Sequence, residues 1–443
     1  MQTNTIPLKR DLGLAAATAI VVGNTIGSGI FMAPQALASV ANPAAAMTAW
    51  IITAVGSFLL AICFANMGAA YPATGGPIVF TRNAFGEFPA FQIAWSYWIG
   101  SWAGNATIIT AFVSYFTYFL PVFGENRLLA FLLSSAVLWT FTIINILGVR
   151  QAGNLGIVTT VLKIVPLLAF VIIGACFFDP ANLTTVSKPE LVGFAGLPAA
   201  IAITLWAFVG LEAATIPAGE IRDPERNIRR STLYGIFFTA LVYLLVSFVA
   251  MGGMPQAELA ASSAPLADII TKVSGLSWGG PLIAFGAVIS TLGATSGWVL
   301  TTARSAYSAG ETGLFPAVMA KVHPRTATPY VSLIVSAILT NLLLILNYVQ
   351  SLTSAFQIML LLATLAFLPA YTFTAAAEML LLVKRSPDFN VWRFLKDSIF
   401  SLLAFAYSIY AIYGTGAEVV MYGFILMLLG IPFYVYVKRS NTL

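Results

Sequence analysis

Residues 23–31 read Gly23-Asn24-Thr25-Ile26-Gly27-Ser28-Gly29-Ile30-Phe31, in the middle of an apolar run from Leu12 to Ala38. The run is long enough to cross a bilayer as a helix, yet it carries three glycines and several hydroxyl and amide side chains. Glycine destabilises a helix interior by roughly 1 kcal/mol relative to Ala, and unwound backbone at membrane depth is tolerated only where protein covers it or where it lines a cavity. The stretch therefore predicts a helix broken at its centre, whose freed N–H groups attract a carboxylate. The alternative is that the glycines only let two helices approach closely.

The composition is that of an integral membrane protein. Of the 443 residues, 59% are hydrophobic and 8% are charged, against roughly 25% charged in soluble domains. Apolar runs of span length recur along the chain, which predicts helices rather than a β-barrel. The net charge of +5 does not indicate nucleic-acid binding, because the basic residues lie in short loops. Cys63 and Cys176 fall in predicted spans and indicate no disulfide framework. The N-terminus leads almost directly into the first span, which we expect to be retained and not a signal peptide.

Hydropathy and length predict twelve spans, at 13–39, 47–70, 89–121, 128–148, 156–177, 195–219, 232–252, 281–310, 329–349, 354–383, 396–414 and 417–437. Most lysines and arginines fall at the N-terminus, in even-numbered loops or at the C-terminus. The exceptions in odd-numbered loops are Arg127, Lys188 and Lys272. By the positive-inside rule, both termini are predicted to be cytoplasmic. Two inner loops, 71–77 and 221–227, carry turn formers or mixed charges and are expected to be structured, with solvated surface loops as the alternative.

The sixth predicted span contains a second irregular stretch, Trp206-Ala207-Phe208-Val209-Gly210-Leu211-Glu212. An intramembrane carboxylate is costly and usually faces the bundle interior. The first and sixth spans stand five apart. Paired glycine-interrupted spans in corresponding positions of two halves point to a transporter binding site built from an inverted repeat.

Single residues at span depth supply further candidates. Lys163 lies seven residues after the predicted start of the fifth span at 156. Its ammonium either substitutes for a bound cation or gains and loses a proton during transport, and the alternative is that it snorkels to the headgroups. Trp298 lies deep beside two glycines, where its ring is placed to stack on a substrate or to hold a cation. His323, the only histidine, is expected to be a loop residue.

These stretches resemble the amino acid–polyamine–organocation (APC) transporters, and among them the basic amino acid/polyamine antiporters. The resemblance covers nearly the whole chain, and it rests on residues 23–31, the Pro-x-x-Gly-Gly loop at 72–76, the Trp206–Glu212 stretch, Tyr97-Trp98 through Asn105, Gly297-Trp298, and the loop 310–316. It implies an all-α polytopic membrane protein with a LeuT-like inverted 5+5 helix repeat. Residues 13–177 and 195–383 would be the two repeats and 396–437 two extra helices, all in a single transporter domain of residues 1–443.

The resemblance also implies a binding site. The substrate carboxylate would meet N–H groups around Ser28 and Gly29, and the α-amino group would meet carbonyls around Thr25, Trp206 and Val209. The distal end of a long substrate would reach Gly100, Ser101 and Asn105, with Trp298 stacked along its stem.

Three residues are implied in gating or proton coupling. Glu212 matches a proton-sensitive gate, and Tyr97 matches an aromatic position near the extracellular entrance. Lys163 departs from the antiporter pattern and resembles a lysine of proton-coupled or exchange-type permeases, whose ammonium resembles the sodium of related carriers. A fixed cation near the site would oppose a dibasic substrate.

We therefore expect a secondary-active amino-acid transporter of the bacterial inner membrane, with no enzymatic chemistry, no cofactor and no metal site. The first hypothesis is exchange of a cationic amino acid for its decarboxylated, polyamine-type product, as arginine for agmatine. The alternative is a proton-coupled or exchange carrier of neutral amino acids. Two hypotheses from other functional classes remain: a membrane receptor or scaffold, and a channel. The expected partners are a small amino acid or polyamine and membrane lipid, with protons and a second copy of the chain left open, and no nucleic acid.

Overall fold

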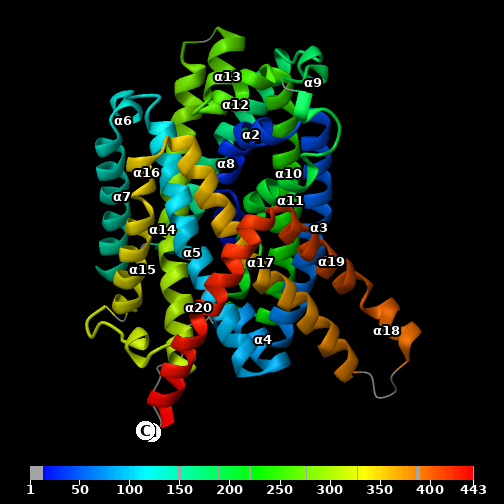
Figure 1. The fold of residues 1–443 in the computed structure, drawn as a ribbon, viewed down its shortest axis with the longest axis vertical. Helices are drawn as coiled ribbons and strands as arrows, with labels where there is room; N and C mark the ends of the chain where they lie inside the picture. The colour runs from blue at the N-terminus through cyan, green and yellow to red at the C-terminus, as the bar shows by residue number, and fades with distance from the viewer. Residues whose placement is uncertain are drawn as a thin grey trace.

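A computed structural model describes residues 13–147, 152–187, 189–216, 218, 221–275, 277–326, 328–385 and 390–442. The regular structure in these ranges is helical (Figure 1). Its long helices are α3 (Pro43–Ala70), α5 (Glu87–Phe116), α7 (Arg127–Leu147), α8 (Ala152–Cys176), α11 (Pro224–Gly253), α14 (Gly279–Glu311), α17 (Leu352–Arg385) and α20 (Ala417–Thr442). Shorter ones at the same depth are α1 (Leu14–Thr25), α2 (Gly29–Val40), α10 (Leu197–Phe208), α15 (Tyr330–Leu343) and α19 (Ile399–Gly414).

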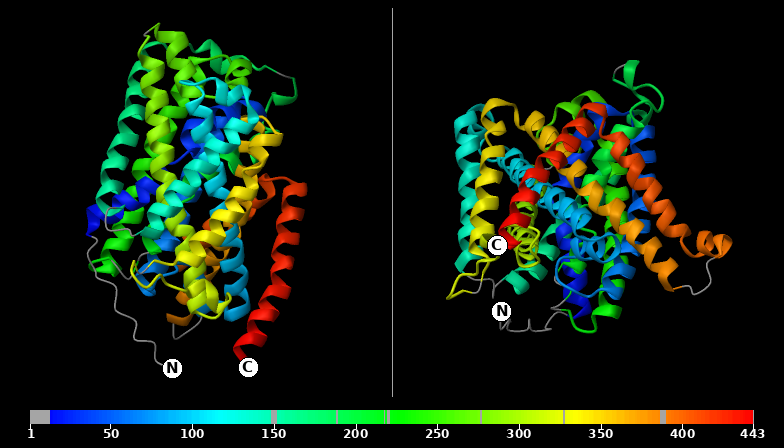
Figure 2. Two further views of the ribbon diagram at one scale, coloured as in Figure 1. Left: turned by 90° about the vertical axis from the view of Figure 1, so that its left-hand side faces the viewer. Right: turned by 60° about the horizontal axis from the view of Figure 1, so that its bottom comes forward.

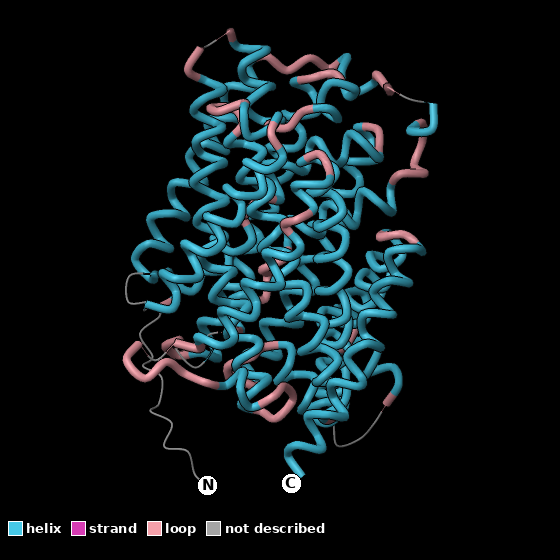
Figure 3. Tube along the Cα trace, turned by 60° about the vertical axis from the view of Figure 1, so that its left-hand side comes forward, coloured by secondary structure: helices cyan, strands magenta, loops and turns pink. Residues whose placement is uncertain are grey.

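Short helices connect these elements, and most of them lie at the two ends of the bundle. They are α4 (Pro77–Phe85), α6 (Val122–Glu125), α9 (Ala181–Thr184), α12 (Gln256–Ala261), α13 (Pro265–Ser274), α16 (Leu346–Val349) and α18 (Val391–Asp397), with 3-10 turns η1 (Pro189–Leu191), η2 (Ala213–Thr215) and η4 (Ala317–Ala320). Figure 3 shows loops at both ends of the bundle and a few short loop segments inside it. The interior segments include the breaks that concern the site.

By length and hydropathy, seven segments in the described ranges can cross a membrane. They are α1 with α2, α3, α7, α11, α14, α17 and α20. The pair α18 and α19, which meet at a bend of 68°, gives an eighth if it counts as one span. The protein is therefore a polytopic helical membrane protein, as the composition predicts. The count of twelve spans and the inverted repeat stay predictions.

Two predicted ranges differ from the helices of the structure. The third was expected to reach residue 121, but α5 ends at Phe116, and α6 begins after Pro121. Proline cannot continue a helix, because it lacks the N–H and clashes with the preceding turn. The ninth, expected over 329–349, is divided into α15 and α16 by a tight turn in which the Ile345 N–H donates to the Leu342 carbonyl (3.2 Å).

The middle of the bundle is formed by α5, α17, α14, α3, α11 and α10. Small residues let these helices approach closely. A Cβ added at Gly56 of α3 would lie 2.4 Å from the Tyr407 ring of α19, and one added at Gly286 of α14 would lie 2.2 Å from Pro166 of α8. Interfaces of this kind are usual between membrane helices. Figures 1 and 2 show α20 standing at the margin of the bundle, where many of its large apolar side chains are exposed.

The C-terminal end of α20 shares one end of the bundle with α4 and α18, while α6, α9 and α13 lie at the other end (Figure 1). At the first end, Glu87 of α5 pairs with Arg82 of α4 (3.1 Å) and with Lys438 of α20. Arg127 and Lys272, the exceptions to the charge pattern, belong to α7 and α13. Lys188 lies outside the described residues.

The inner loop at 71–77 is structured, as predicted. Gly75 and Gly76 adopt φ values of 121° and 49°, a region that favours glycine. A Cβ added at Gly76 would lie 2.7 Å from the hydroxyl of Thr215 in η2. The loop therefore packs directly against the turn that follows α10.

Candidate functional site

The predicted break in the first span lies between α1 and α2. Helix α1 ends at Thr25, and α2 begins at Gly29 with Ser28 as its N-cap. The first hydrogen bond of α2 runs from the Met32 N–H to the Ser28 carbonyl (3.2 Å), so the N–H groups of the preceding turn have no partner within the helix. The buried Ser28 hydroxyl also has no hydrogen-bond partner among the described residues. The start of α2 therefore presents unpaired donors in the interior of the bundle.

Gly29 lies at this break and also packs closely against α10. A Cβ added there would lie 2.7 Å from the Ala207 Cα of α10. Close approach of helices, the alternative explanation for the glycines, therefore holds at Gly29. By contrast, a Cβ at Gly27 would make only an ordinary contact, 3.5 Å from Ala294.

The second break follows α10 at Phe208. The Val209 N–H donates to the Trp206 carbonyl (3.2 Å), and Gly210 then adopts a φ of 110°. A Cβ at Gly210 would lie 2.9 Å from the carbonyl carbon of Asn24 in α1. The two breaks therefore touch, and only glycine combines this backbone conformation with this approach.

Three consecutive carbonyls at the end of α1 each accept a hydrogen bond from a different helix. The Gly23 carbonyl accepts from Lys163 Nζ of α8 (2.8 Å), and the Asn24 carbonyl accepts from Trp298 Nε1 of α14 (3.2 Å). The Thr25 carbonyl accepts from the Tyr243 hydroxyl of α11 (2.8 Å). The last carbonyls of a helix have no intrahelical partner, and here three side chains supply one.

The Tyr243 hydroxyl also lies 2.9 Å from the Ala207 carbonyl at the end of α10. One phenolic proton cannot bond fully to two carbonyls, but the Thr25 carbonyl also accepts from the Gly27 N–H (2.9 Å). Tyr243 is a residue that the sequence did not single out, because it lies within the regular apolar pattern of α11.

Glu212 is fully buried and is held by phenols from two helices. Its carboxylate accepts from the Tyr97 hydroxyl of α5 (2.9 Å), from the Tyr371 hydroxyl of α17 (2.8 Å) and from the Gly210 N–H (3.2 Å). Predicted gating residues Glu212 and Tyr97 are thus brought together. Tyr371 was not predicted. The carboxylate links the second break to α5 and α17.

Lys163 is 2% exposed and does not reach the headgroups, so the snorkelling alternative is wrong. The structure holds it on α1 through the Gly23 carbonyl. Lys163 and Glu212 form no ion pair with each other: both lie in the described part of the chain, and each has the separate partners given above. Lys163 therefore contacts the break between α1 and α2, and Glu212 contacts the break after α10.

The predicted distal contacts lie on one face of α5. Ser101 donates to the Tyr97 carbonyl (2.7 Å), and Asn105 Nδ2 donates to Thr302 Oγ1 of α14 (3.0 Å). The buried Asn105 Oδ1 has no hydrogen-bond partner among the described residues. A Cβ added at Gly100 would lie 3.1 Å from the Phe367 ring of α17.

Phe367 is a further residue that the sequence did not indicate. Its ring makes edge contacts with Tyr97 (centroids 5.0 Å apart) and with Trp298 (5.6 Å). Trp206 lies next to this group, since a Cβ at Gly104 would be 3.0 Å from its ring. Aromatic rings from α5, α10, α14 and α17 therefore gather beside the two breaks.

A second buried carboxylate lies outside this group. Glu378 of α17 accepts from Asn66 Nδ2 of α3 (2.5 Å) and from Ser401 Oγ of α19 (2.8 Å), and it is 4% exposed. It falls inside the predicted tenth span, so the rule that singled out Glu212 would also have found it.

Comparison with known proteins gives consistent relatives along the whole chain. The family profile described as amino acid permease matches residues 12–434. The chain is 32% identical over 440 residues to an arginine/agmatine antiporter of Chlamydia abortus, covering 96% of this chain and 90% of that protein. It is 31% identical over 434 residues to the arginine/agmatine antiporter of Chlamydia trachomatis (96% and 89% covered) and 30% identical over 441 residues to that of Chlamydia pneumoniae (96% and 90%).

Proposed function

Since this chain belongs to the amino acid permease family, we propose that it exchanges a cationic amino acid for its decarboxylated product across the bacterial inner membrane, as arginine for agmatine. The observation that carries the proposal is the meeting of two helix breaks in the buried middle of the bundle. Relatives similar over nearly the full length are named arginine/agmatine antiporters, which supports this substrate pair.

The two breaks suit the part that all amino acids share. The start of α2 offers unpaired N–H groups, the positive end of a helix and the Ser28 hydroxyl, which together favour a carboxylate. The ends of α1 and α10 offer the carbonyls of Thr25 and Ala207, which both lie within hydrogen-bond distance of the Tyr243 hydroxyl, while the Thr25 carbonyl also accepts from the Gly27 N–H. An α-ammonium has three donors, so it can serve both carbonyls where the phenol serves one.

The side chain of a long substrate would extend along α5. Trp298, Phe367 and Trp206 supply ring faces and edges for its stem, and a guanidinium held near an aromatic face is stabilised by the ring quadrupole. At the distal end, the unpaired Asn105 Oδ1 is an acceptor for a cationic donor. Ser101 and Gly100 complete this end, with Gly100 leaving room for Phe367.

Coupling to protons is assigned to the two buried charges. Glu212 would be the proton-responsive gate, because gaining a proton changes its bonds to Tyr97 and Tyr371 on two other helices. Lys163 would be a fixed cation that holds α1 in place. Both assignments are independent of the substrate.

The proposed architecture is the inverted repeat, with 13–177 and 195–383 as its halves, 396–437 as two added helices and twelve spans in all. In this division the broken α1–α2 and α10 segments would occupy corresponding positions in the two halves, as expected for an inverted repeat. Both termini would face the cytoplasm, since Arg82, Lys384 and Lys438 lie toward one end of the bundle and Arg127 and Lys272 toward the other.

A carrier of neutral amino acids is the second candidate, and Lys163 favours it. Its ammonium binds Gly23, two residues before the Thr25 carbonyl proposed for the substrate. A fixed cation this close to the site raises the free energy of binding a substrate that carries an additional positive charge.

Counterflow in proteoliposomes tests these alternatives. Vesicles are loaded with arginine, agmatine, ornithine, putrescine or leucine, and the uptake of labelled arginine is followed. We expect internal arginine and agmatine to accelerate uptake strongly and leucine to have little effect. In parallel vesicles supplied with labelled leucine, uptake that internal leucine accelerates, without uptake of labelled arginine, would support the neutral carrier instead. Uptake that is independent of the internal solute would contradict exchange and indicate a channel, and the absence of any uptake would indicate a receptor or scaffold.

A further inference from the structure

The start of α11 carries arginines that the transport site does not use. Arg226, Arg229 and Arg230 line a surface hollow of about 480 Å³ together with Leu233 and Tyr234. All three arginines are exposed. In the part of the chain that the structure describes, none of them forms an ion pair with an acidic side chain.

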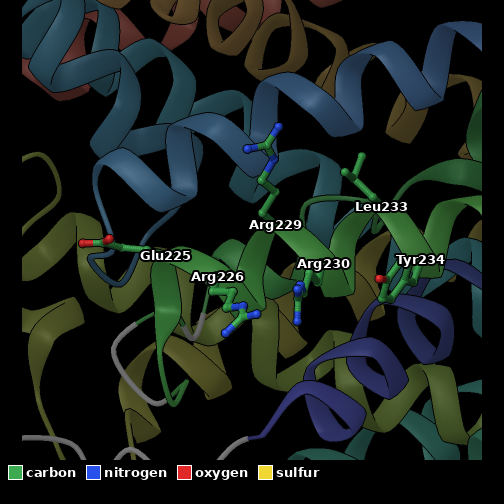
Figure 4. A pocket seen from close by; sticks show the side chains of 6 residues that line it. All are labelled: Glu225, Arg226, Arg229, Arg230, Leu233 and Tyr234. Atoms are coloured by element: carbon green, nitrogen blue, oxygen red, sulfur yellow. The ribbon is translucent and has the colours of Figure 1, made fainter.

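Figure 4 shows how these side chains are arranged. Arg226, Arg230 and Tyr234 lie in a row on one side of α11, as their spacing of four residues requires. Arg229 points to the other side of the helix. Glu225, the acid that also lines the hollow, points away from Arg226 and Arg230, so it does not neutralise the row.

The row continues along α11 as an apolar stripe, which we call the α11 stripe. Its members lie on the same helical face and are between 42% and 66% exposed: Tyr234, Phe237, Leu241, Leu245 and Phe248. From Arg230 to Phe248 the helix rises about 27 Å, close to the roughly 30 Å of a bilayer hydrocarbon core. Arg226 and Arg230 therefore lie at the level of the headgroups when the stripe faces the acyl chains.

From this juxtaposition we propose a binding site for one anionic phospholipid on the outer face of α11. The phosphate of the lipid binds Arg226 and Arg230, Tyr234 lies at the boundary, and one acyl chain lies along the α11 stripe. Arginine is suited to phosphate because its planar fork donates two parallel hydrogen bonds. A free phosphate would use the arginines and leave the stripe without a function.

The site is distinct from the transport site but not remote from it. Tyr243, which binds the carbonyls at both helix breaks, lies on the same helix, on its buried face. The proposal does not depend on the proposed substrate, because lipid retention is measured without transport.

Native mass spectrometry of the full-length protein in detergent tests the site. The protein is titrated with dioleoylphosphatidylglycerol or with dioleoylphosphatidylcholine, and bound lipids are counted. The test variant is Arg226→Gln with Arg230→Gln. The matched control, Lys321→Gln with Arg325→Gln, removes the same charge from another exposed loop. A basic residue near a membrane surface raises the affinity for an anionic lipid about fivefold. The affinity of the test variant for its most tightly bound phosphatidylglycerol should therefore fall roughly thirtyfold.

Under the proposal, the control variant keeps that lipid, phosphatidylcholine binds all variants equally weakly, and millimolar inorganic phosphate does not displace the lipid. The proposal is overturned if the control loses as much as the test variant, if phosphatidylcholine binds equally well, or if phosphate competes. Should the test variant fail to fold, salt titration of the wild type decides. At 1 M salt the Debye length is about 3 Å, so the electrostatic part of the affinity should fall, and an affinity for phosphatidylglycerol that does not change with salt would overturn the site.

Discussion

Deleting the hydroxyl of Tyr371 is expected to lower the free energy of unfolding by about 2 kcal/mol. The hydroxyl donates to Glu212 at 2.8 Å, and both residues are fully buried. A hydrogen bond to a charged group contributes about 1.5–3 kcal/mol. In Tyr371→Phe the ring keeps its edge contact with Phe64 at 5.4 Å, so apolar packing changes little. The loss therefore reports the bond to the carboxylate.

A double-mutant cycle separates this bond from any other effect of the substitution. In the Glu212→Gln background the acceptor is neutral, and the same deletion should cost only about 0.5–1.5 kcal/mol. The expected coupling is therefore about 1 kcal/mol. Tyr410→Phe removes the same atom from an exposed position of α19 and should change stability by less than about 0.5 kcal/mol.

The assay is reversible unfolding in mixed micelles, with counterflow against pH as the functional measurement. Tyr371→Phe should also shift the pH at which transport changes, whereas Tyr410→Phe should not. Equal losses in the wild-type and Glu212→Gln backgrounds would show that Glu212 is not the partner that matters. The assignment of Glu212 as the gate would then lose its structural support.

Three further predictions follow from the remaining contacts. Lys163→Ala leaves the Gly23 carbonyl unpaired and should impair transport and stability at every pH, whereas Glu212→Gln should flatten the pH profile of counterflow. If Glu212→Gln keeps the wild-type pH profile and Lys163→Ala loses it, Lys163 is the proton carrier. Trp298→Ala should weaken binding of a cationic substrate by roughly 5- to 30-fold and of a neutral one by less, and equal losses in calorimetry would mean that the ring only packs. Lys438 and Arg82 hold the pKa of the Glu87 carboxyl below its ordinary value. The ionised carboxylate therefore adds to the free energy of unfolding above its unfolded pKa, about 4.3, and this stabilisation is lost as pH falls through the lower folded pKa. Glu87→Gln should therefore be less stable than the wild type at pH 7 and indistinguishable from it in strong acid, and a difference that persists in acid would contradict the ion pair.

The two helix breaks could be predicted from the sequence because glycine and polar residues are conspicuous in an apolar run. Gly210 shows the reason most clearly, since its φ of 110° and its approach to Asn24 each require glycine. Glu212 and Lys163 were found by the same logic, because charge at span depth is costly. The same rule applies to Glu378, which lies in the predicted tenth span.

The partners of these groups could not be predicted. Tyr243, Tyr371 and Phe367 are aromatic residues in continuous apolar helices, where an unbroken helical pattern gives no signal of a hydrogen bond. Which helix faces them depends on tertiary packing alone. The same holds for the distance between Lys163 and Glu212, which periodicity within single helices does not determine.

The polar groups at the two breaks are not equally satisfied. On the carbonyl side, Lys163, Trp298 and Tyr243 hold the end of α1 from three different helices. On the amide side, the start of α2 has no capping side chain, and the Ser28 hydroxyl is unpaired among the described residues. An unpaired buried donor costs about 1–3 kcal/mol, so this side gains most when an anionic ligand binds. A substrate ammonium, by contrast, must compete with donors that the protein already supplies. The carboxylate of the amino acid is therefore expected to add affinity on this side, whereas the decarboxylated product has no carboxylate and is expected to bind through its cationic groups alone.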